Sequence, residues 1–309
     1  MQNNLVTIGI PTYNRCTLLD ASIASALAQS HTNIEVIVCD NASTDGTHDV
    51  CLKWEATDKR FKWHRQTANI GPVGNFNSLP ALAKGHYFMW LADDDRISPN
   101  YIEECLTILE GDASVVLASG LATFLHPDGR RQNGISVRAT SSNRWLRVIK
   151  YLFLVRDNSG FYGLMRTDLV QDMKMKHTLA GDWLWVMGLS FLGKIKVAEK
   201  AMLTRSADGE SADFDRLMQS NGYTPLQRAF PYLNIACSVR AEILTNPLFI
   251  RFTQVPERLI GSLLAACASA IGQGVFWRSV AFLSRVLNKF GNNRLGDSLR
   301  RVVRSLMGI

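Results

Sequence analysis

The front half of the chain alternates short apolar runs with longer stretches in which apolar residues recur at helical spacing. The short runs are typical of strands, and the longer stretches are typical of helices. Strands are predicted at residues 5–10, 34–39, 61–65, 87–91 and 114–118, and helices at 18–29, 45–56, 73–84 and 100–110. Because strands that alternate with helices build βαβ units, the pattern predicts an α/β fold with a mainly parallel sheet flanked by helices.

The middle of the chain is less regular, and from about residue 215 the pattern changes to helices alone. Pro127-Asp128-Gly129 is a turn signal between two extended runs and predicts a hairpin. The other elements expected here are a helix over 141–154, a strand over 160–165, a helix over 178–192 and a strand after Gly193. Residues 216–309 are then expected to form an all-helical C-terminal extension.

Charge divides the chain at the same point. Residues 1–215 carry 22 Lys and Arg against 24 Asp and Glu, whereas residues 216–309 carry 12 against 3. The net charge of +7 therefore arises in the C-terminal region, which predicts a module whose partner is an anionic surface, with membrane phospholipid the first choice. Nucleic acid is not expected, because these basic helices contain no recognition motif.

The C-terminal region contains two kinds of apolar segment. The run 259–271 has 13 residues, fewer than the about 20 that a membrane span needs, so it predicts a packed helix or, alternatively, an interfacial segment. Helices over 276–290 and 295–306 place apolar residues on one face and basic residues on another. They either contact a membrane surface, through residues 275–309, or pack on a core and expose a solvated face.

Two further features concern the cellular compartment. Residues 1–5 do not form a basic segment followed by an apolar one, so no secretory signal is expected. The six cysteines are scattered and include no Cys-x-x-Cys pair, which predicts reduced thiols and no zinc site. A cytoplasmic protein is therefore expected.

Three consecutive carboxylates, Asp93, Asp94 and Asp95, follow the apolar run 87–91. Adjacent carboxylates resist one another's ionisation unless a cation compensates, and their hard oxygen ligands suit Mg²⁺ or Mn²⁺. The position at the end of a strand favours a ligand site, since ligands of open α/β sheets bind outside the carboxyl ends of the strands. The alternative is a solvated acidic turn that caps the helix near Pro99.

The end of the first strand carries groups that suit a nucleotide. Pro11, Thr12, Tyr13 and Arg15 supply an aromatic ring, a hydroxyl and a guanidinium, which are able to stack on a base and hold phosphate. No Gly-x-Gly-x-x-Gly motif follows this strand. Its absence disfavours a Rossmann oxidoreductase.

The second strand is followed by a polar run at residues 40–47. The carboxylate of Asp40 is able to accept a hydrogen bond from an N–H group of a nucleobase. Ser43 and Thr44 are expected to cap the helix that begins near residue 45.

These residues, together with the loop 69–75 and the Asp triplet, make the chain resemble the family 2 glycosyltransferases, which are inverting enzymes with the GT-A fold. The four motifs occur in family order, each after a predicted strand, and cover residues 5–100. The nucleotide-binding residues that the resemblance implies are Pro11, Thr12, Tyr13, Arg15, Asp40, Asn69, Gly71, Asn75, Asp93 and Asp94. We assign Asp93 to the ribose side, and Asp94 and Asp95 to a divalent metal, Mn²⁺ or Mg²⁺, that meets the diphosphate.

The resemblance also implies a general base and a division of the chain. The segment Ala180-Gly181-Asp182-Trp183 matches the family's later Gly-Asp motif at the start of a helix, so Asp182 is the expected base that takes a proton from the acceptor hydroxyl. The alternative role of Asp182 is a helix N-cap. The GT-A catalytic domain would span 1–215, with a nucleotide-binding half at 1–118 and an acceptor-side half at 119–215, followed by the basic helical region 216–309.

The leading hypothesis is a metal-dependent inverting glycosyltransferase of cell-surface polysaccharide synthesis. It would move a sugar from a nucleotide diphosphate sugar, with UDP the expected nucleotide, onto a hydroxyl of a glycan or lipid-linked glycan at the cytosolic face of the inner membrane. A nucleotidyltransferase is one alternative, which predicts consumption of a nucleoside triphosphate and gives Asp182 no clear role. A catalytically inactive glycan-binding scaffold is another, and it would need neither the Asp triplet nor Asp182.

Overall fold

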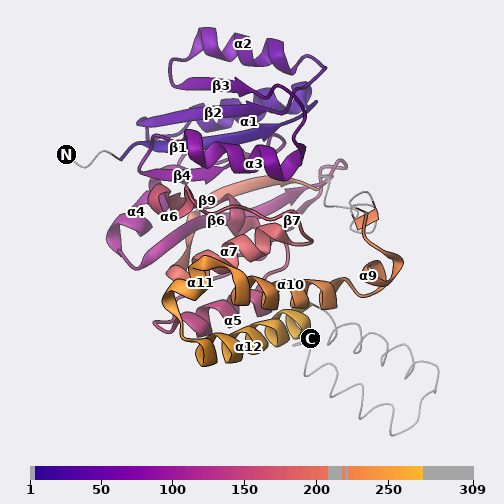
Figure 1. Ribbon diagram of the computed structural model, residues 1–309. Helices are drawn as coiled ribbons and strands as arrows, with labels where there is room; N and C mark the ends of the chain where they lie inside the picture. The colour runs from indigo at the N-terminus through magenta and orange to yellow at the C-terminus, as the bar shows by residue number, and fades with distance from the viewer. Residues whose placement is uncertain (1–3, 208–217, 220–221, 274–309) are drawn as a thin grey trace, which may run out of the picture.

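Figure 1 shows the computed structural model of the protein, which describes residues 4–207, 218–219 and 222–273. Its centre is a nine-stranded sheet in the order β3-β2-β1-β4-β8-β6-β9-β5, with β7 paired to β6. The strands are β1 Val6–Thr12, β2 Ile34–Asp40, β3 Phe61–Arg65, β4 Tyr87–Trp90, β5 Arg96–Ile97, β6 Val115–Leu125, β7 Arg131–Asn133, β8 Leu164–Arg166 and β9 Lys194–Ser206. Strands β3, β2, β1 and β4 are all parallel, as is the pair β6 and β9, whereas β8 runs antiparallel to both β4 and β6. The predicted mainly parallel sheet is confirmed.

The helices follow the predicted alternation with the strands. They are α1 Cys16–Leu27, α2 Thr47–Thr57, α3 Gly71–Leu82, α4 Tyr101–Gly111, α5 Arg144–Leu154, α6 Thr167–Val170, α7 Gly181–Leu192, α9 Pro225–Ala229, α10 Pro231–Thr245, α11 Pro247–Phe252 and α12 Val255–Gln273. The hairpin expected at Pro127-Asp128-Gly129 joins β6 to the antiparallel β7, and Gly129 has a φ of +81°, a conformation that favours glycine at such a turn.

The strand predicted over 160–165 is present only at its end, as β8, and the prediction is wrong for residues 160–163. The chain there forms a 3-10 turn, η1 Ser159–Tyr162, and only then the short strand β8. Asn158 precedes the turn with a left-handed φ of 48°, and a Cβ added to Gly163 would lie 2.8 Å from the carbonyl oxygen of Ala118. The close approach to β6 therefore dictates a turn where the apolar pattern predicts a strand.

The sheet is covered by a core on each face, because successive side chains of a strand point to opposite sides. Val36 and Val38 of β2 belong to the core that includes α1 and α4, and Ile37 and Cys39 belong to the core that includes α5 and α7. All six cysteines are free thiols, as predicted.

The second core contains an aromatic cluster centred on β4. Trp90 stacks on Phe161 with 4.6 Å between ring centroids and contacts Trp185 of α7 edge-on at 4.8 Å. Burial of three such rings is a large part of the apolar surface that holds η1 and α7 against the sheet. This packing fixes the positions of η1 and α7 relative to β4.

The C-terminal region is helical throughout its described part. Helix α12 has 19 residues, whereas the apolar run predicted from the sequence has 13. The helix begins earlier, at Val255, because proline is tolerated in the first turn of a helix and Pro256 lies there. It is the one described helix long and apolar enough to cross a membrane, with a mean hydropathy of 1.2 and 33% of the span buried. Length and composition alone are weak evidence for a span, since core helices pass the same test. The helices predicted over 276–290 and 295–306 lie outside the described residues.

A buried arginine joins α5 to the end of α7. Arg147 is 6% exposed, and its guanidinium donates hydrogen bonds to the carbonyl oxygens of Ser190 and Phe191, both 2.8 Å away. It also donates to the carbonyl oxygens of Ser141 and Ser142, just before α5. These contacts satisfy carbonyls in the last turn of α7 that have no partner within the helix.

We expect the Arg147→Met substitution to lower the free energy of unfolding by about 2–4 kcal/mol, because it leaves buried carbonyls without donors. Urea unfolding followed by circular dichroism measures this loss. The matched control is Lys150→Met on the exposed side of the same helix, which should change the free energy by less than about 0.5 kcal/mol. Equal effects of the two substitutions would contradict the structural role of Arg147.

Candidate functional site

The carboxyl ends of β1 and β4 bring two of the predicted motifs together. The hydroxyl of Thr12 donates to Asp93 Oδ2 at 2.7 Å. Arg15, three residues further on, forms an ion pair with Asp94 at 3.7 Å between Nη1 and Oδ2. Neighbouring parallel strands end at the same edge of the sheet, so residues 81 positions apart in the chain become direct partners.

Asp40 lies one strand further along the same edge and is fully buried. Its Oδ1 accepts a hydrogen bond from the backbone N–H of Ser43 at 2.9 Å. Its Oδ2 has no hydrogen-bond partner and lies 3.7 Å from Nε of Arg65, the last residue of β3. Arg65 was not predicted from the sequence, although its place at the end of a strand that pairs with β2 is a usable signal.

Ser43 and Thr44 do not cap α2, which is a correction to the prediction. The helix begins at Thr47, and the first-turn N–H of that residue is satisfied by Asp45 Oδ1 at 3.0 Å. Ser43 Oγ accepts instead from the backbone N–H of Asn14, and Asn14 Oδ1 accepts from the backbone N–H of Thr44. The side chains that resemble helix caps therefore tie the loops after β1 and β2 to each other.

The loop 69–75 is fastened to the end of β2 by Asn41. The amide of Asn41 donates to Asn69 Oδ1 at 2.8 Å and accepts from the backbone N–H of Ile70 at 2.9 Å. Asn75 is buried and donates to the carbonyl oxygen of Cys39 at 2.8 Å. The predicted loop is thus held by buried amides, and Asn41 is the residue that sequence reasoning did not identify.

The outer face of this edge is open for a planar group. The ring of Tyr13 is 43% exposed, and Gly71, with a φ of +77°, has nothing within 4 Å of the place a Cβ would take. An exposed aromatic ring is a suitable surface for stacking a base, and open space at a glycine lets a ligand approach the backbone. The nucleotide-binding roles of Tyr13 and Gly71 stay predictions.

Asp95 differs from its two neighbours in being 2% exposed. Its Oδ1 accepts from the backbone N–H of Ser206 at 3.1 Å, and its Oδ2 lies 3.4 Å from Nε of Arg205. Burial raises the pKa of Asp95 to about 7; Arg205 lowers it and Asp94 raises it. The guanidinium of Arg205 contacts two aromatic rings, 5.1 Å from the centroid of Phe124 and 4.9 Å from that of Tyr162.

Asp182 lies in the first turn of α7 and is partly buried. Its Oδ2 accepts from Nδ2 of Asn158 at 2.8 Å, while Asn158 Oδ1 accepts from the hydroxyl of Tyr151 at 2.7 Å. Burial raises the pKa of Asp182, whereas the bond from Asn158 and the positive charge of Arg205 lower it. The residue before the helix, Ala180, makes no side-chain cap, and Asp182 is not in the N-cap position.

Backbone strain is concentrated in these loops. Among the described residues, the four non-glycine residues with positive φ are Asn14, Ala42, Asn158 and Ala180. Asn14 follows β1, Ala42 follows β2, Asn158 precedes η1 and Ala180 precedes α7. Sparsely populated conformations persist where the surrounding contacts fix a particular geometry, as at functional sites.

A divalent metal fits Asp94 and Asp95, the predicted ligands, by the chemistry of their carboxylate oxygens. The described part of the chain contains no cluster of three or more His, Cys, Asp or Glu side chains with metal-site geometry. Mg²⁺ and Mn²⁺ are nevertheless commonly held by one or two carboxylates, with water and substrate phosphates completing the coordination. The side chain of Asp94 is 13% exposed and that of Asp95 is 3% exposed, so Asp94 is the more accessible of the two. Its Oδ2 lies 3.7 Å from Nη1 of Arg15.

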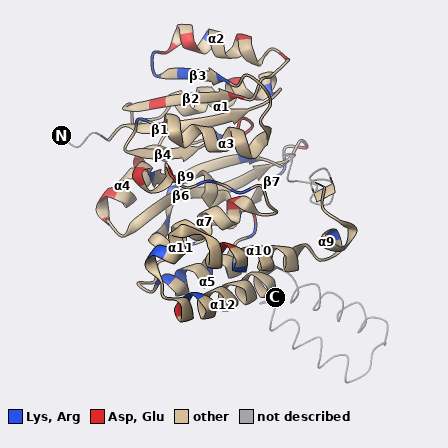
Figure 2. Ribbon diagram, viewed as in Figure 1, with Lys and Arg blue, Asp and Glu red and all other residues tan. Residues whose placement is uncertain are grey.

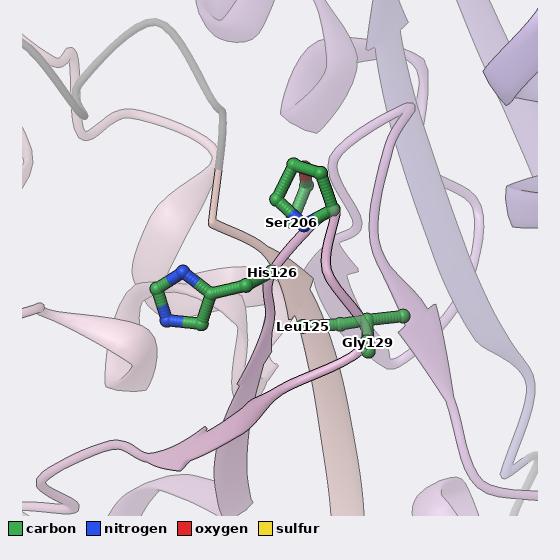
Figure 3. A pocket seen from close by; sticks show the side chains of 5 residues that line it. Leu125, His126, Gly129 and Ser206 are labelled. Atoms are coloured by element: carbon green, nitrogen blue, oxygen red, sulfur yellow. The ribbon is translucent and has the colours of Figure 1, made fainter.

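A surface cavity of about 420 Å³ lies between the β6–β7 hairpin and the end of β9 (Figure 3). It is lined by Leu125, His126, Pro127, Gly129 and Ser206. Ser206 is the residue whose backbone N–H bonds Asp95, so the β6–β7 hairpin borders the same edge of the sheet as the Asp triplet. All five lining residues lie within residues 119–215, the predicted acceptor-side half.

The sequence profile of glycosyl transferase family 2 matches residues 7–173, which is more than half of the chain. The chain belongs to glycosyl transferase family 2. It is 29% identical over 160 residues to abequosyltransferase RfbV of Salmonella typhimurium, a match that covers 50% of this chain and 45% of that protein. The first curated relatives of this family 2 glycosyltransferase are likewise covered over less than two thirds of their own length.

Two solved structures share the fold of this family 2 glycosyltransferase. TarS 1–349 of S. aureus in complex with UDP-GlcNAc is 19% identical with a TM-score of 0.55, and the match covers 84% of this chain and 79% of that one. The mannosyltransferase PcManGT of Pyrobaculum calidifontis in complex with GDP-Man and Mn²⁺ is 14% identical with a TM-score of 0.55, and the match covers 98% and 80%. The expected GT-A fold with a C-terminal helical region is confirmed.

Proposed function

We propose that the protein is a metal-dependent inverting glycosyltransferase that moves a sugar from a nucleotide diphosphate sugar to a hydroxyl of a glycan or lipid-linked glycan in cell-surface polysaccharide synthesis. The observation that carries the proposal is the convergence of donor-side carboxylates and a separate, oriented carboxylate at one edge of the sheet. Arg205 links them, because it forms an ion pair with Asp95 and also interacts electrostatically with Asp182.

The donor would bind across the carboxyl ends of β1, β2 and β4. Tyr13 would stack on the base, Asp40 would accept a hydrogen bond from the base, and Asp93 would meet the ribose. The Oδ2 of Asp40, which has no hydrogen-bond partner, and the exposed side chain of Tyr13 support this placement. UDP is our proposed nucleotide, and its support is the UDP-GlcNAc bound to the similarly folded TarS.

Asp94 is the proposed metal ligand, and the ion would offset the negative charge that develops on the departing diphosphate. The Mn²⁺ bound with GDP-Man in PcManGT supports a metal in this fold. Asp95, the second metal ligand predicted from the sequence, would have to exchange its contact with Arg205 for the ion.

Asp182 would act as the general base. Its carboxylate would take the proton of the acceptor hydroxyl as that oxygen attacks the anomeric carbon from the face opposite the nucleotide. The bond from the anomeric carbon to the diphosphate oxygen then breaks, and the nucleoside diphosphate leaves with the bonding pair. The raised pKa of Asp182 and its hydrogen bond to Asn158 support this role, because they describe an oriented base that binds a proton more readily than an exposed carboxylate.

Calorimetric titration with UDP, GDP, dTDP and CMP, each with and without Mn²⁺, tests the donor site. We expect tight, metal-dependent binding of one of the diphosphates. A separate incubation with nucleoside triphosphates that releases pyrophosphate would favour the nucleotidyltransferase alternative. If no nucleotide binds, the glycosyltransferase proposal fails and the inactive glycan-binding scaffold takes its place.

A cytoplasmic protein on the cytosolic face of the inner membrane is part of the proposal, supported by the basic composition of residues 275–309. Removal of these residues is expected to lower binding to anionic vesicles, as measured by sedimentation. A truncated chain that sediments with the vesicles to the same extent as the full chain would contradict a membrane contact through this segment.

Asn158 is expected to position the proposed base. Asn158→Gly keeps the left-handed backbone conformation that residue 158 requires but removes the amide that holds Asp182. We expect kcat for transfer to fall by about 10- to 100-fold with the KM for the donor unchanged, since small displacements of a catalytic group have effects of this size. Steady-state kinetics with the donor varied measures both.

Tyr151→Phe provides a graded comparison for Asn158→Gly. It removes only the hydroxyl that holds Asn158 and keeps the ring in its buried place. Its effect on kcat should be smaller than that of Asn158→Gly. A loss in KM alone, or a larger effect of Tyr151→Phe, would contradict the positioning role.

A further inference from the structure

Helix α12 turns its small residues toward the protein and its large apolar residues outward. Gly261, Ala265 and Ala268 are buried, and a Cβ added to Gly261 would lie 2.5 Å from the ring of Trp145 on α5. The large apolar side chains are 44% to 60% exposed, and we call them the α12 face: Val255, Leu259, Ile260, Leu263, Leu264 and Ile271. A helix on the surface of a soluble domain is expected to do the reverse. Single exposed apolar residues need no explanation, but a continuous face marks an interaction site.

Helix α5 extends the α12 face, because the two helices run side by side in the same direction. At one end, Arg144 of α5 donates to the carbonyl oxygen of Phe252, just before α12. At the other end, a Cβ added to Gly272 would lie 2.4 Å from the carbonyl oxygen of Phe153 on α5. Leu146 and Phe153 are 56% and 45% exposed. Both helices lie at the end of the molecule opposite α2 (Figure 1).

Positive charge accompanies this apolar surface. Lys150 lies between the two exposed apolar residues of α5, and Arg251 precedes α12; both are exposed. Figure 2 shows Lys and Arg in blue on the ribbon near the α5 and α11 labels. In the described part of the chain, neither Lys150 nor Arg251 forms an ion pair with a carboxylate. Glu257 is the acidic residue of α12, and its Oε1 is engaged by the indole N–H of Trp145 at 2.7 Å.

We propose that the α12 face, with the outer side of α5, lies in the interface of an anionic phospholipid membrane, with α12 parallel to the membrane plane. Apolar side chains bordered by Lys and Arg match acyl chains bordered by anionic headgroups. The buried side of α12 packs on α5 and α10, so the helix binds the membrane from its surface and does not cross it.

The same charge disfavours the other occupants of the α12 face. A second copy would bring its own Lys150 and Arg251 to the same face and so add like charge there. The chain's own residues 274–309 carry seven Lys and Arg against one Asp, so they too would bring like charge to the face. An anionic surface accommodates both the face and that segment.

Sedimentation of the full chain with vesicles tests the proposal. We expect the protein to bind vesicles of phosphatidylglycerol and phosphatidylcholine. The affinity of the double variant Ile260→Glu, Leu263→Glu for these vesicles should be lower by about tenfold or more. Lys150→Glu should weaken binding to these mixed vesicles but not to phosphatidylcholine alone. The matched control is Leu52→Glu on α2, a leucine with 45% exposure at the opposite end of the molecule, which should bind as the unsubstituted protein does. Unchanged thermal unfolding of the variants excludes loss of fold as the cause.

Three results would overturn the proposal. One is vesicle binding that the double variant leaves unchanged, or that the unsubstituted protein lacks. Another is a dimer that the double variant converts to monomers without any vesicle binding, which assigns the face to a second copy. The third is protease cleavage within 274–309 that appears only in the double variant and without vesicles, which assigns the face to the chain's own segment. None of these results depends on the donor or on Asp182.

Discussion

Asp182→Asn is expected to abolish sugar transfer while leaving nucleotide binding unchanged. The amide keeps the shape of the side chain but cannot take a proton, and general-base catalysis contributes about 10²- to 10⁴-fold to such reactions. We therefore expect kcat to fall by about 10³-fold. Transfer from the donor that binds in calorimetry, measured beside nucleotide affinity in the same preparation, separates the two effects.

The pH dependence of transfer gives a second measurement of the same role. Burial raises the pKa of Asp182, so the carboxylate becomes protonated at a higher pH than an exposed aspartate, whose pKa is about 4. The rate should fall as the pH drops through this raised pKa, because only the ionised form accepts the proton. The sign for stability is opposite. Ionisation of a buried carboxyl opposes folding. The contribution of Asp182 to the free energy of unfolding therefore falls as the pH rises from its pKa in the unfolded chain to its raised pKa in the folded protein.

Asp168→Asn is the matched control for Asp182→Asn. Asp168 is an exposed aspartate in the first turn of a neighbouring helix, α6, so it shares the local position without the contacts of the site. Its substitution should leave transfer unchanged. Retention of transfer in Asp182→Asn, or loss of nucleotide binding together with transfer, would remove Asp182 from the role of base.

The donor side of the site could be predicted from the sequence because its residues stand at strand ends. Thr12 and Asp93 each follow an apolar run, and parallel strands place such residues at one edge. Their hydrogen bond is the direct consequence of that geometry. The same rule would have identified Arg65, had the end of β3 been considered.

The partners of Asp95 and Asp182 could not be predicted in this way. Arg205 reaches Asp95 only because β9 pairs with β5 and β6 over a long register that includes a bulge, and the apolar pattern does not specify that register. Asn158 reaches Asp182 through a 3-10 turn in a stretch whose pattern predicts a strand. Contacts that depend on tertiary pairing and on left-handed backbone are not encoded in periodicity.

The orientation of α12 illustrates a related limit. Its sequence shows large and small apolar residues on different sides, but both kinds are compatible with burial. The small side is turned inward because Gly261 and Gly272 allow α5 to approach within contact of the α12 backbone. Only the packed structure therefore reveals that the bulky side is exposed.

Asp94→Ala is expected to remove the metal-dependent part of donor binding and to lower transfer by about 100-fold or more, because a bound metal contributes several kcal/mol to stabilising the leaving diphosphate. Calorimetry with UDP should show an affinity that Mn²⁺ no longer improves. Arg15, released from its ion pair with Asp94, would remain available to the diphosphate in the proposed site, so metal-free binding of UDP should be retained.

Asp95→Asn decides whether the neighbouring carboxylate shares the ion. Both oxygens of Asp95 face protein groups, the N–H of Ser206 and the guanidinium of Arg205, so its substitution should lower stability but leave the Mn²⁺ effect on UDP affinity. If Asp95→Asn abolishes the Mn²⁺ effect and Asp94→Ala does not, the ligand assignment reverses, and Arg205 must move away from Asp95 when the donor binds. Either result identifies the carboxylate that meets the diphosphate, because the two residues differ in burial and in partners although they are adjacent in the chain.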